Sequence, residues 1–239
     1  MSNANAYNRE SAEKYGWEPS WFEASAFDDD LAEKVSAFQL RMGLSPDGMC
    51  GPSTFRRIFT EREADIDDYL SPAVERRGGN HIVVNGAFVP IDWHKVVLWS
   101  EDNGLKSKAG SYRSQAGKPK RDVKMFVVHW DAALNSRSCH RILGRRNLSV
   151  HFLIDNDATI YQCCDLQHVC FHAGSRRANA SSVGVEISNA WYPKYQDWYV
   201  KHGHGQRPMV WNARVHGRRL EPFLGFYPTQ IGALTALMK

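Results

Sequence analysis

Two residues in the second half of the chain have side chains that could support hydrolytic chemistry. His129 lies near the end of the apolar segment MFVVHW, and Glu186 lies within SVGVEIS. Catalytic zinc typically has three protein ligands and one open position for water, and an imidazole at a rigid strand end suits such a site. A glutamate nearby would take a proton from the water and pass it to a leaving group. Taken alone, a histidine on an apolar strand is more often a hydrogen-bonded core residue, and the glutamate could be an exposed or arginine-paired carboxylate.

The segments around these two residues alternate between strand and helix patterns. We expect strands over residues 125–130, 149–155, 159–164 and 181–189, and helices over residues 136–146 and 227–239. The first strand is apolar enough to be buried, and Ser136 or Ser138 would cap the first helix. The last helix carries Ile231, Leu234 and Leu237 on one face. This alternation predicts an α/β domain, with a mixed sheet and flanking helices.

The N-terminal part differs from the rest in charge and in pattern. Residues 1–80 hold 9 basic and 15 acidic side chains, whereas residues 81–239 hold 21 and 11. Such a change of sign indicates two units with different surfaces. We divide the chain into a small helical domain at residues 5–60, a linker and hairpin extension at 61–122, and a second domain at 123–239. The Asn85-Gly86 dipeptide in the extension predicts a type I′ hairpin, and residues 100–122 predict a surface loop.

A spaced pattern in the N-terminal domain is typical of one family. Val35, Phe38-Gln39, Gly43-Leu44, Asp47-Gly48, Gly51 and Thr54 reproduce the V..FQ...GL..DG..G..T pattern. It resembles the peptidoglycan-binding domains, which are three-helix modules attached to cell-wall hydrolases. The resemblance implies peptidoglycan as the partner, with Phe38 packing the helices together. A small helical domain without a ligand is the alternative.

Four motifs of the C-terminal domain occur in a recognisable order. They are VVHW, SVHFLIDNDATIYQ, FHAGSRRANASSVGVEIS and FYPTQIGALTALMK. Together they resemble the zinc-dependent N-acetylmuramoyl-L-alanine amidases, which include phage lysins, muropeptide-recycling amidases and peptidoglycan-recognition proteins. The resemblance covers residues 123–239. It implies cleavage of the amide between the lactyl group of N-acetylmuramic acid and L-alanine of the stem peptide, with Zn²⁺ as the cofactor.

The same resemblance implies roles for individual residues. His129 corresponds to the first zinc ligand, and Glu186 corresponds to the catalytic glutamate. Family members without this glutamate use a tyrosine at the position of Val150. This sequence has the glutamate and lacks the tyrosine, as expected for a member that uses the glutamate. His172, in the FHAG motif, and Asn179 are expected to contact the substrate, although Asn179 would serve equally well to form a turn.

Three further residues near these motifs have less specific expectations. His151 aligns with a family histidine behind the site, so we expect a structural or supporting role. Arg176 and Arg177 either face the carboxylates of the stem peptide or belong to a solvated loop.

The sequence departs from the family in its remaining metal ligands. In the family, the second and third zinc ligands follow the helix that begins near FYPTQ, whereas this sequence stops at Lys239. We therefore expect a C-terminal truncation, with those ligands beyond Lys239. Within the sequence, His202, His204 and His216 are the alternative candidates. One ligand cannot hold zinc tightly, because affinity comes from several preorganised donors.

Composition argues against several classes of protein. The sequence has no run of eighteen apolar residues, so we expect no membrane insertion, and its N-terminus lacks a secretory signal. The five cysteines include no CxxC pair, so we expect reduced thiols rather than a disulfide framework. The basic residues form no stripe interleaved with aromatic residues, so nucleic-acid binding is not expected.

These observations together predict a monomeric peptidoglycan hydrolase of the phage endolysin kind. Such a protein would remain in the cytoplasm until another protein gave it access to the cell wall. The alternative is a non-catalytic peptidoglycan-binding protein that has lost its metal site. Metal content and wall-lysing activity would separate the two.

Overall fold

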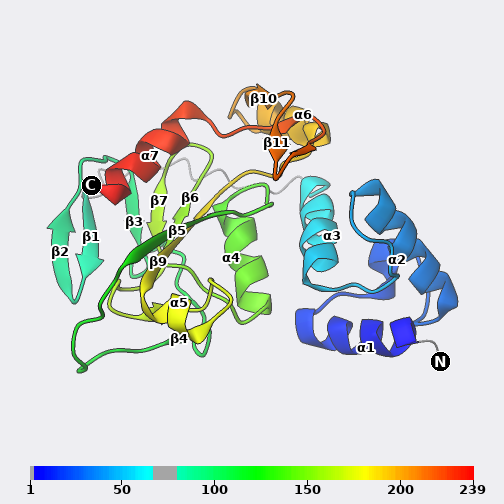
Figure 1. Cartoon of the computed structure of the whole chain (residues 1–239), viewed down its shortest axis with the longest axis horizontal. Helices are drawn as coiled ribbons and strands as arrows, with labels where there is room; N and C mark the ends of the chain where they lie inside the picture. The colour runs from blue at the N-terminus through cyan, green and yellow to red at the C-terminus, as the bar shows by residue number, and fades with distance from the viewer. Residues whose placement is uncertain (1–2, 67–79) are drawn as a thin grey trace. The chain divides into compact units, whose positions relative to one another are not determined.

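The structure, a computed structural model, describes residues 3–66 and 80–239. Much of the predicted linker, residues 67–79, lies outside the described residues. The chain divides into two compact units, residues 1–66 and 67–239 (Figure 1).

The first unit is helical, as predicted. Its elements are α1 (Asn3–Tyr15), the 3-10 helix η1 (Pro19–Phe22), α2 (Asp29–Arg41) and α3 (Pro52–Ala64). Asp28 caps α2, because its carboxylate accepts a hydrogen bond from the Leu31 amide at 3.1 Å. Phe38 is buried and packs edge-to-face on Phe22, with the ring centroids 5.5 Å apart. The predicted packing role of Phe38 is therefore confirmed.

One buried glutamine explains much of the N-terminal sequence pattern. The Gln39 amide nitrogen lies 2.7 Å from a carboxylate oxygen of Asp47 and 3.0 Å from both Met49 O and Thr54 Oγ1. Its amide oxygen accepts a hydrogen bond from Gly48 N at 2.9 Å. Gln39 therefore ties the end of α2 to the turn before α3, which accounts for these residue types at this spacing.

The second unit is built on a five-stranded mixed sheet. Its strands are β3 (Val96–Leu98), β5 (Met125–Trp130), β6 (Phe152–Ile154), β7 (Ile160–Gln162) and β9 (Ser182–Ile187). Their order is β3-β7-β6-β9-β5. β6 and β7 form an antiparallel pair, and the other neighbours are parallel. The predicted mixed sheet with flanking helices is confirmed.

Short strands and helices surround this sheet. They are β1 (His81–Val84), β2 (Ala87–Pro90), β4 (Tyr112–Arg113), β8 (Val169–Cys170), α5 (Arg176–Ala180), η2 (Pro193–Tyr195), α6 (Gln196–Lys201), β10 (Met209–Val210), β11 (Arg214–Val215), β12 (Arg218–Arg219) and β13 (Phe223–Leu224). β1 and β2 form the predicted hairpin, and its two loop residues have positive φ, 53° at Asn85 and 77° at Gly86. Positive φ at both positions is the geometry of a type I′ turn.

Two longer helices flank the sheet (Figure 1). They are α4 (Ser136–Arg145), which contacts β6 and β9, and α7 (Pro228–Met238), which contacts β6. The main apolar core lies on the α7 side of the sheet and includes Phe152, Ile154, Val185, Ile187 and Ala233. No helix in the described part of the chain is long and apolar enough to cross a membrane.

Three local expectations were wrong. β5 is only half-buried, with Val128 44% exposed, because it forms an edge of the sheet. α4 is capped by Asn135, whose side chain accepts from Ser138 N at 2.9 Å, rather than by Ser136 or Ser138.

The third correction concerns the buried face of α7. Gln230, Ala233 and Ala236 are the buried residues of this helix, whereas Ile231 is 44% exposed. Leu234 and Leu237 are partly buried against the core. The small alanine side chains let the helix approach the sheet closely, and this moves the buried face away from Ile231.

Candidate functional site

His129 and Glu186 lie side by side on the sheet. β5 pairs in parallel with β9, and the register sets His129 against Glu186. Glu186 is also in register with Leu153 on β6. Side chains in register on neighbouring strands project from the same face, and the strands are about 4.8 Å apart. The residues predicted as zinc ligand and catalytic base are therefore neighbours on one face of the sheet.

The position of β9 holds Glu186 firmly. This strand is flanked by β6 and β5, and Glu186 is only 5% exposed. Its neighbours Val185 and Ile187 face the apolar core on the opposite side. Proton transfer depends first on geometry, and a strand with partners on both edges fixes a carboxylate better than a loop does.

His172 joins His129 at this face. Nδ1 of His172 lies 3.0 Å from Nε2 of His129, and the two rings are nearly perpendicular. Nε2 of His172 lies 3.2 Å from Oγ of Ser182, whose hydroxyl donates to Ala178 O at 2.7 Å. The Ser182 oxygen is then the acceptor for Nε2–H of His172. This leaves Nδ1 of His172 as an acceptor facing His129.

The surroundings keep the His172 imidazole neutral. Burial, with smaller contributions from the nearby His151, His129 and Arg121, lowers the pKa of His172 to about 3. At neutral pH the ring therefore carries one proton, in agreement with the tautomer set by Ser182. A neutral ring presents a lone pair on Nδ1 toward the site.

The loop after His172 is held by Asn179. Its side-chain oxygen accepts from His172 N at 3.1 Å and from Ala173 N at 2.7 Å. Ser175 caps the following short helix by accepting from Ala178 N at 3.1 Å. The geometry therefore gives Asn179 a turn-forming contact that positions His172. The substrate contacts of Asn179 and His172 stay predictions.

A cavity of about 390 Å³ opens beside this loop. It is lined by Arg113, Val169, Phe171, Gly174, Ser175, Arg176 and Asn179. Two of its lining residues are arginines, which suit an anionic group of a ligand. Arg176 was a candidate from the sequence, whereas Arg113 was not, because Arg113 lies on β4 in a polar stretch with no pattern of its own.

His151 lies behind the site, as expected from the resemblance. The side chain is fully buried, and Nδ1 accepts from Gly184 N at 3.0 Å. Because Nδ1 is an acceptor, Nε2 carries the proton and donates to His168 O at 3.0 Å; Nη2 of Arg121 also lies 3.2 Å from Nε2. Both ring nitrogens are thus engaged with the backbone, and this favours a structural role.

Arg121 is a residue that sequence reasoning missed. Its guanidinium donates to the carbonyl oxygens of Leu166, Asn179, Ala180 and Ser182 at 2.7–3.3 Å. It thereby fastens the start of β9 to the end of α5 and to the loop that carries Leu166. The only signal available in the sequence was an arginine shortly before the predicted strand at residues 125–130.

The described donors do not complete a zinc site. In residues 3–66 and 80–239, no three His, Cys, Asp or Glu side chains gather as a group that could hold a metal ion. His129 and His172 converge, but a third donor is not supplied. The alternative candidates lie elsewhere: His202 and His204 stack on Trp198, and His216 is exposed in the β11–β12 turn.

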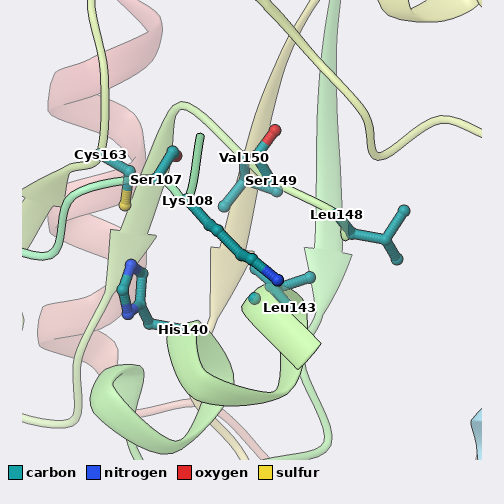
Figure 2. Close-up of a pocket in the computed structure, with 9 residues that line it drawn as sticks. Ser107, Lys108, His140, Leu143, Leu148, Ser149, Val150 and Cys163 are labelled. Atoms are coloured by element: carbon teal, nitrogen blue, oxygen red, sulfur yellow. The ribbon is translucent and has the colours of Figure 1, made fainter. Parts of the chain in front are cut away.

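A second hollow lies beside α4 (Figure 2). His140, Leu143, Ser107 and Cys163 are among its lining residues, and its water-accessible volume is about 10 Å³. This is room for about one water molecule. The hollow is therefore too small to be a substrate site.

Comparisons with known proteins agree with these features. A family model described as N-acetylmuramoyl-L-alanine amidase matches residues 119–239, and one described as putative peptidoglycan binding domain matches residues 13–58. No curated protein matches the chain.

Solved structures also match part of the chain. One is the N-acetylmuramyl-L-alanine amidase AmiD from E. coli, in complex with anhydro-N-acetylmuramic acid-L-Ala-D-gamma-Glu-L-Lys, at 24% identity and a TM-score of 0.34. Another is AmpDH3 from Pseudomonas aeruginosa, at 22% identity and a TM-score of 0.33. The matches cover 52% and 54% of this chain and 45% and 48% of those chains, so this chain spans about half their length.

Proposed function

Because the chain belongs to the N-acetylmuramoyl-L-alanine amidase family, we propose that it hydrolyses the amide between N-acetylmuramic acid and L-alanine in peptidoglycan. The observation that carries this proposal is the register of β5 with β9, which sets His129 beside Glu186. In the reaction, water adds to the lactyl carbonyl and the C–N bond breaks. The products are the lactyl carboxylate and the free amine of L-alanine.

Glu186 is the residue we assign to proton transfer. Its carboxylate takes a proton from the attacking water and then delivers it to the departing amine. The neutral His172 ring, fixed between His129 and Ser182, lines the same face of the sheet. Arg113 and Arg176, in the neighbouring cavity, would bind carboxylates of the stem peptide.

The full chain with purified peptidoglycan tests this assignment. We expect release of stem peptides that begin with a free L-alanine amine, measured by mass spectrometry. Glu186→Gln keeps the size of the side chain but removes the base, so the rate should fall by about 100-fold or more. Glu221→Gln, on an exposed residue, is the control and should leave the rate unchanged. Equal rates for wild type and Glu186→Gln would remove Glu186 from the mechanism.

Zinc is the cofactor that we propose on the strength of the family resemblance. His129 would be one ligand, and its convergence with His172 supports a metal near this face. Because the described donors do not complete the site, we assign no step to the metal. Equilibrium dialysis of the purified chain against Zn²⁺ checks this, because an incomplete donor set binds zinc only weakly: weak binding that is lost in His129→Ala is the expected result. Absence of zinc from an active chain would contradict it.

A non-catalytic peptidoglycan-binding protein is the second candidate. The observation that favours it is the incomplete donor set in the part of the chain that is described. It predicts that the chain co-sediments with peptidoglycan but releases no stem peptide, with or without added zinc. Release of stem peptide that stops in the presence of a chelator would exclude this candidate.

We further propose that the protein acts as an endolysin. The match of residues 13–58 to a peptidoglycan-binding domain supports a two-part protein in which binding raises the local concentration of substrate. Cytoplasmic residence before release is part of this proposal. Added from outside, the chain should lyse permeabilised bacteria but leave intact Gram-negative cells unaffected; no lysis of either would count against it.

A further inference from the structure

The buried side chains of Cys164 and Cys170 contact each other, with Cys170 on β8. The Sγ atoms of Cys164 and Cys170 are 3.3 Å apart, and the two residues are only 4% and 0% exposed. Both are free thiols in the structure. A disulfide has an S–S distance of about 2.05 Å, so the two sulfurs would need to move closer by only about 1.2 Å.

The backbone on each side of this pair is anchored. Cys164 O accepts from the Gln162 side chain at 3.1 Å, and Cys170 pairs with Tyr112 in the β4–β8 ladder. Between them, the Asp165 carboxylate accepts from Asn85 N at 2.8 Å and from Gly86 N at 2.6 Å. The fold therefore holds the two thiols close together. Forming the bond in the folded state would cost little additional conformational entropy.

A third cysteine next in sequence is directed elsewhere. Cys163 lines the small hollow beside His140 (Figure 2), and its Sγ lies 3.9 Å from Tyr161 O. A bond between Cys163 and Cys164 is disfavoured, because adjacent Cα atoms are about 3.8 Å apart, closer than disulfides usually allow. The arrangement therefore selects Cys164 as the partner of Cys170.

We propose that Cys164 and Cys170 are a site of disulfide formation. The oxidant is a small-molecule disulfide such as glutathione disulfide. One cysteine thiolate attacks it and releases one glutathione thiol, and the second cysteine then attacks the mixed disulfide and releases the other. One protein S–S bond forms, the glutathione S–S bond breaks, and two electrons pass to the two glutathione thiols.

The proposed bond would stabilise the loop between Cys164 and Cys170, which contacts Arg121 and His151. The loop between the two cysteines supplies Leu166 O, which binds Arg121 at 2.7 Å, and His168 O, which lies 3.0 Å from His151 Nε2. Closing a loop of this length raises the midpoint of thermal unfolding by about 5 °C. The bond would stabilise this loop whether or not the chain has the proposed activity.

Peptide mapping of the full chain tests the pairing. The chain is incubated with excess glutathione disulfide in urea below its unfolding transition, so that buried thiols become accessible, and is then denatured and alkylated. Cleavage before aspartate separates residues 157–164 from residues 165–196. We expect these two peptides to remain joined, in wild type and in Cys163→Ser, and to separate after dithiothreitol. They should not join in Cys170→Ser.

Two results would overturn the proposal. One is that both peptides carry alkylated thiols after oxidation of the wild-type chain. The other is that joining disappears in Cys163→Ser, which would assign the bond to Cys163. The thermal midpoint gives an independent reading, because oxidation should raise it equally in wild type and Cys163→Ser and leave it unchanged in Cys164→Ser.

Discussion

Gly184 on β9 lies directly beneath the ring of His172. A Cβ atom at position 184 would come within 2.7 Å of three atoms of the imidazole. The same glycine donates its amide proton to Nδ1 of His151. The absence of a side chain at Gly184 thus allows His172 to pack against the strand that carries Glu186, and the position of His172 depends on it.

Gly184→Ala should therefore displace His172. The added methyl group forces the ring away from Ser182 and His129, and we expect the amidase rate to fall by at least about tenfold. Overpacking of this kind costs about 1–3 kcal/mol in stability. Gly144→Ala is the matched control: it lies in α4 with no atom within 4 Å of its Cβ position and should keep full activity. Full activity of Gly184→Ala would show that the ring position is not required.

Much of the fold follows from local sequence signals. The Asn85-Gly86 dipeptide identifies its hairpin because positive φ at two successive residues suits few other pairs. Asp28 identifies the start of α2, because an aspartate side chain can cap the free amides at a helix N-terminus. The half-exposure of β5 was not predicted, because the apolar pattern of a strand does not reveal whether it lies at a sheet edge. The buried face of α7 was also not predicted, because it consists of alanines and a glutamine, which give a weaker hydrophobic signal than Ile231.

The candidate site was predictable only in part. The strand motifs identified His129 and Glu186, and the register of β5 with β9 brings them together. Ser182 sets the tautomer of His172 and Arg121 ties three segments, yet neither has a distinctive sequence context. Their roles come from contacts between segments far apart in the chain, which no single stretch of sequence records.

Asp155 should make the stability of the second unit depend on pH. Burial raises the pKa of this carboxyl to about 6, with a further contribution from Asp157. The folded state then binds the proton of Asp155 more tightly than the unfolded state does. The resulting contribution to the free energy of unfolding is fully present below about pH 4. It is lost as the pH rises through 6, with a magnitude of up to about 3 kcal/mol.

Asp155→Asn removes this dependence. The amide oxygen can still accept from Ser136 N and Asn156 N, as the carboxylate does. The difference in thermal midpoint between variant and wild type should therefore grow in favour of the variant from pH 4 to pH 7. Buried histidines with lowered pKa values titrate in the opposite direction, but they are common to both proteins and cancel in the difference. A constant difference across this pH range would contradict the raised pKa of Asp155.

Gln39→Ala should loosen the turn before α3 in the first unit. It removes contacts to Asp47, Met49 O and Thr54 and leaves the amide of Gly48 without its acceptor. We expect a loss of about 2 kcal/mol. Hydrogen exchange of the Gly48 amide measures this directly and should accelerate. Leu40→Ala, on the neighbouring exposed residue, is the control and should leave that exchange rate unchanged.

Arg207 is a buried cation without a carboxylate partner among its described contacts. Its guanidinium donates to Gly225 O, Ser188 O and the side chains of Gln230 and Asn156. The rings of Tyr199 and Tyr227 lie 4.2 Å and 4.4 Å from it. This one residue joins the segment after β9 to α7 and to the turn that follows β6.

Arg207→Met should destabilise the second unit strongly. Methionine fills part of the space between the tyrosines, but the oxygens that accept from Arg207 lose their donor inside the protein. We expect a cost of about 3 kcal/mol or more, seen as a fall of about 10 °C in the thermal midpoint. Arg207→Lys should recover only part of this, because an ammonium lacks the planar fork of a guanidinium. Arg219→Met, on an exposed arginine, is the control and should shift the midpoint little. If Arg207→Met and Arg219→Met unfold at the same temperature, the network around Arg207 does not stabilise the fold.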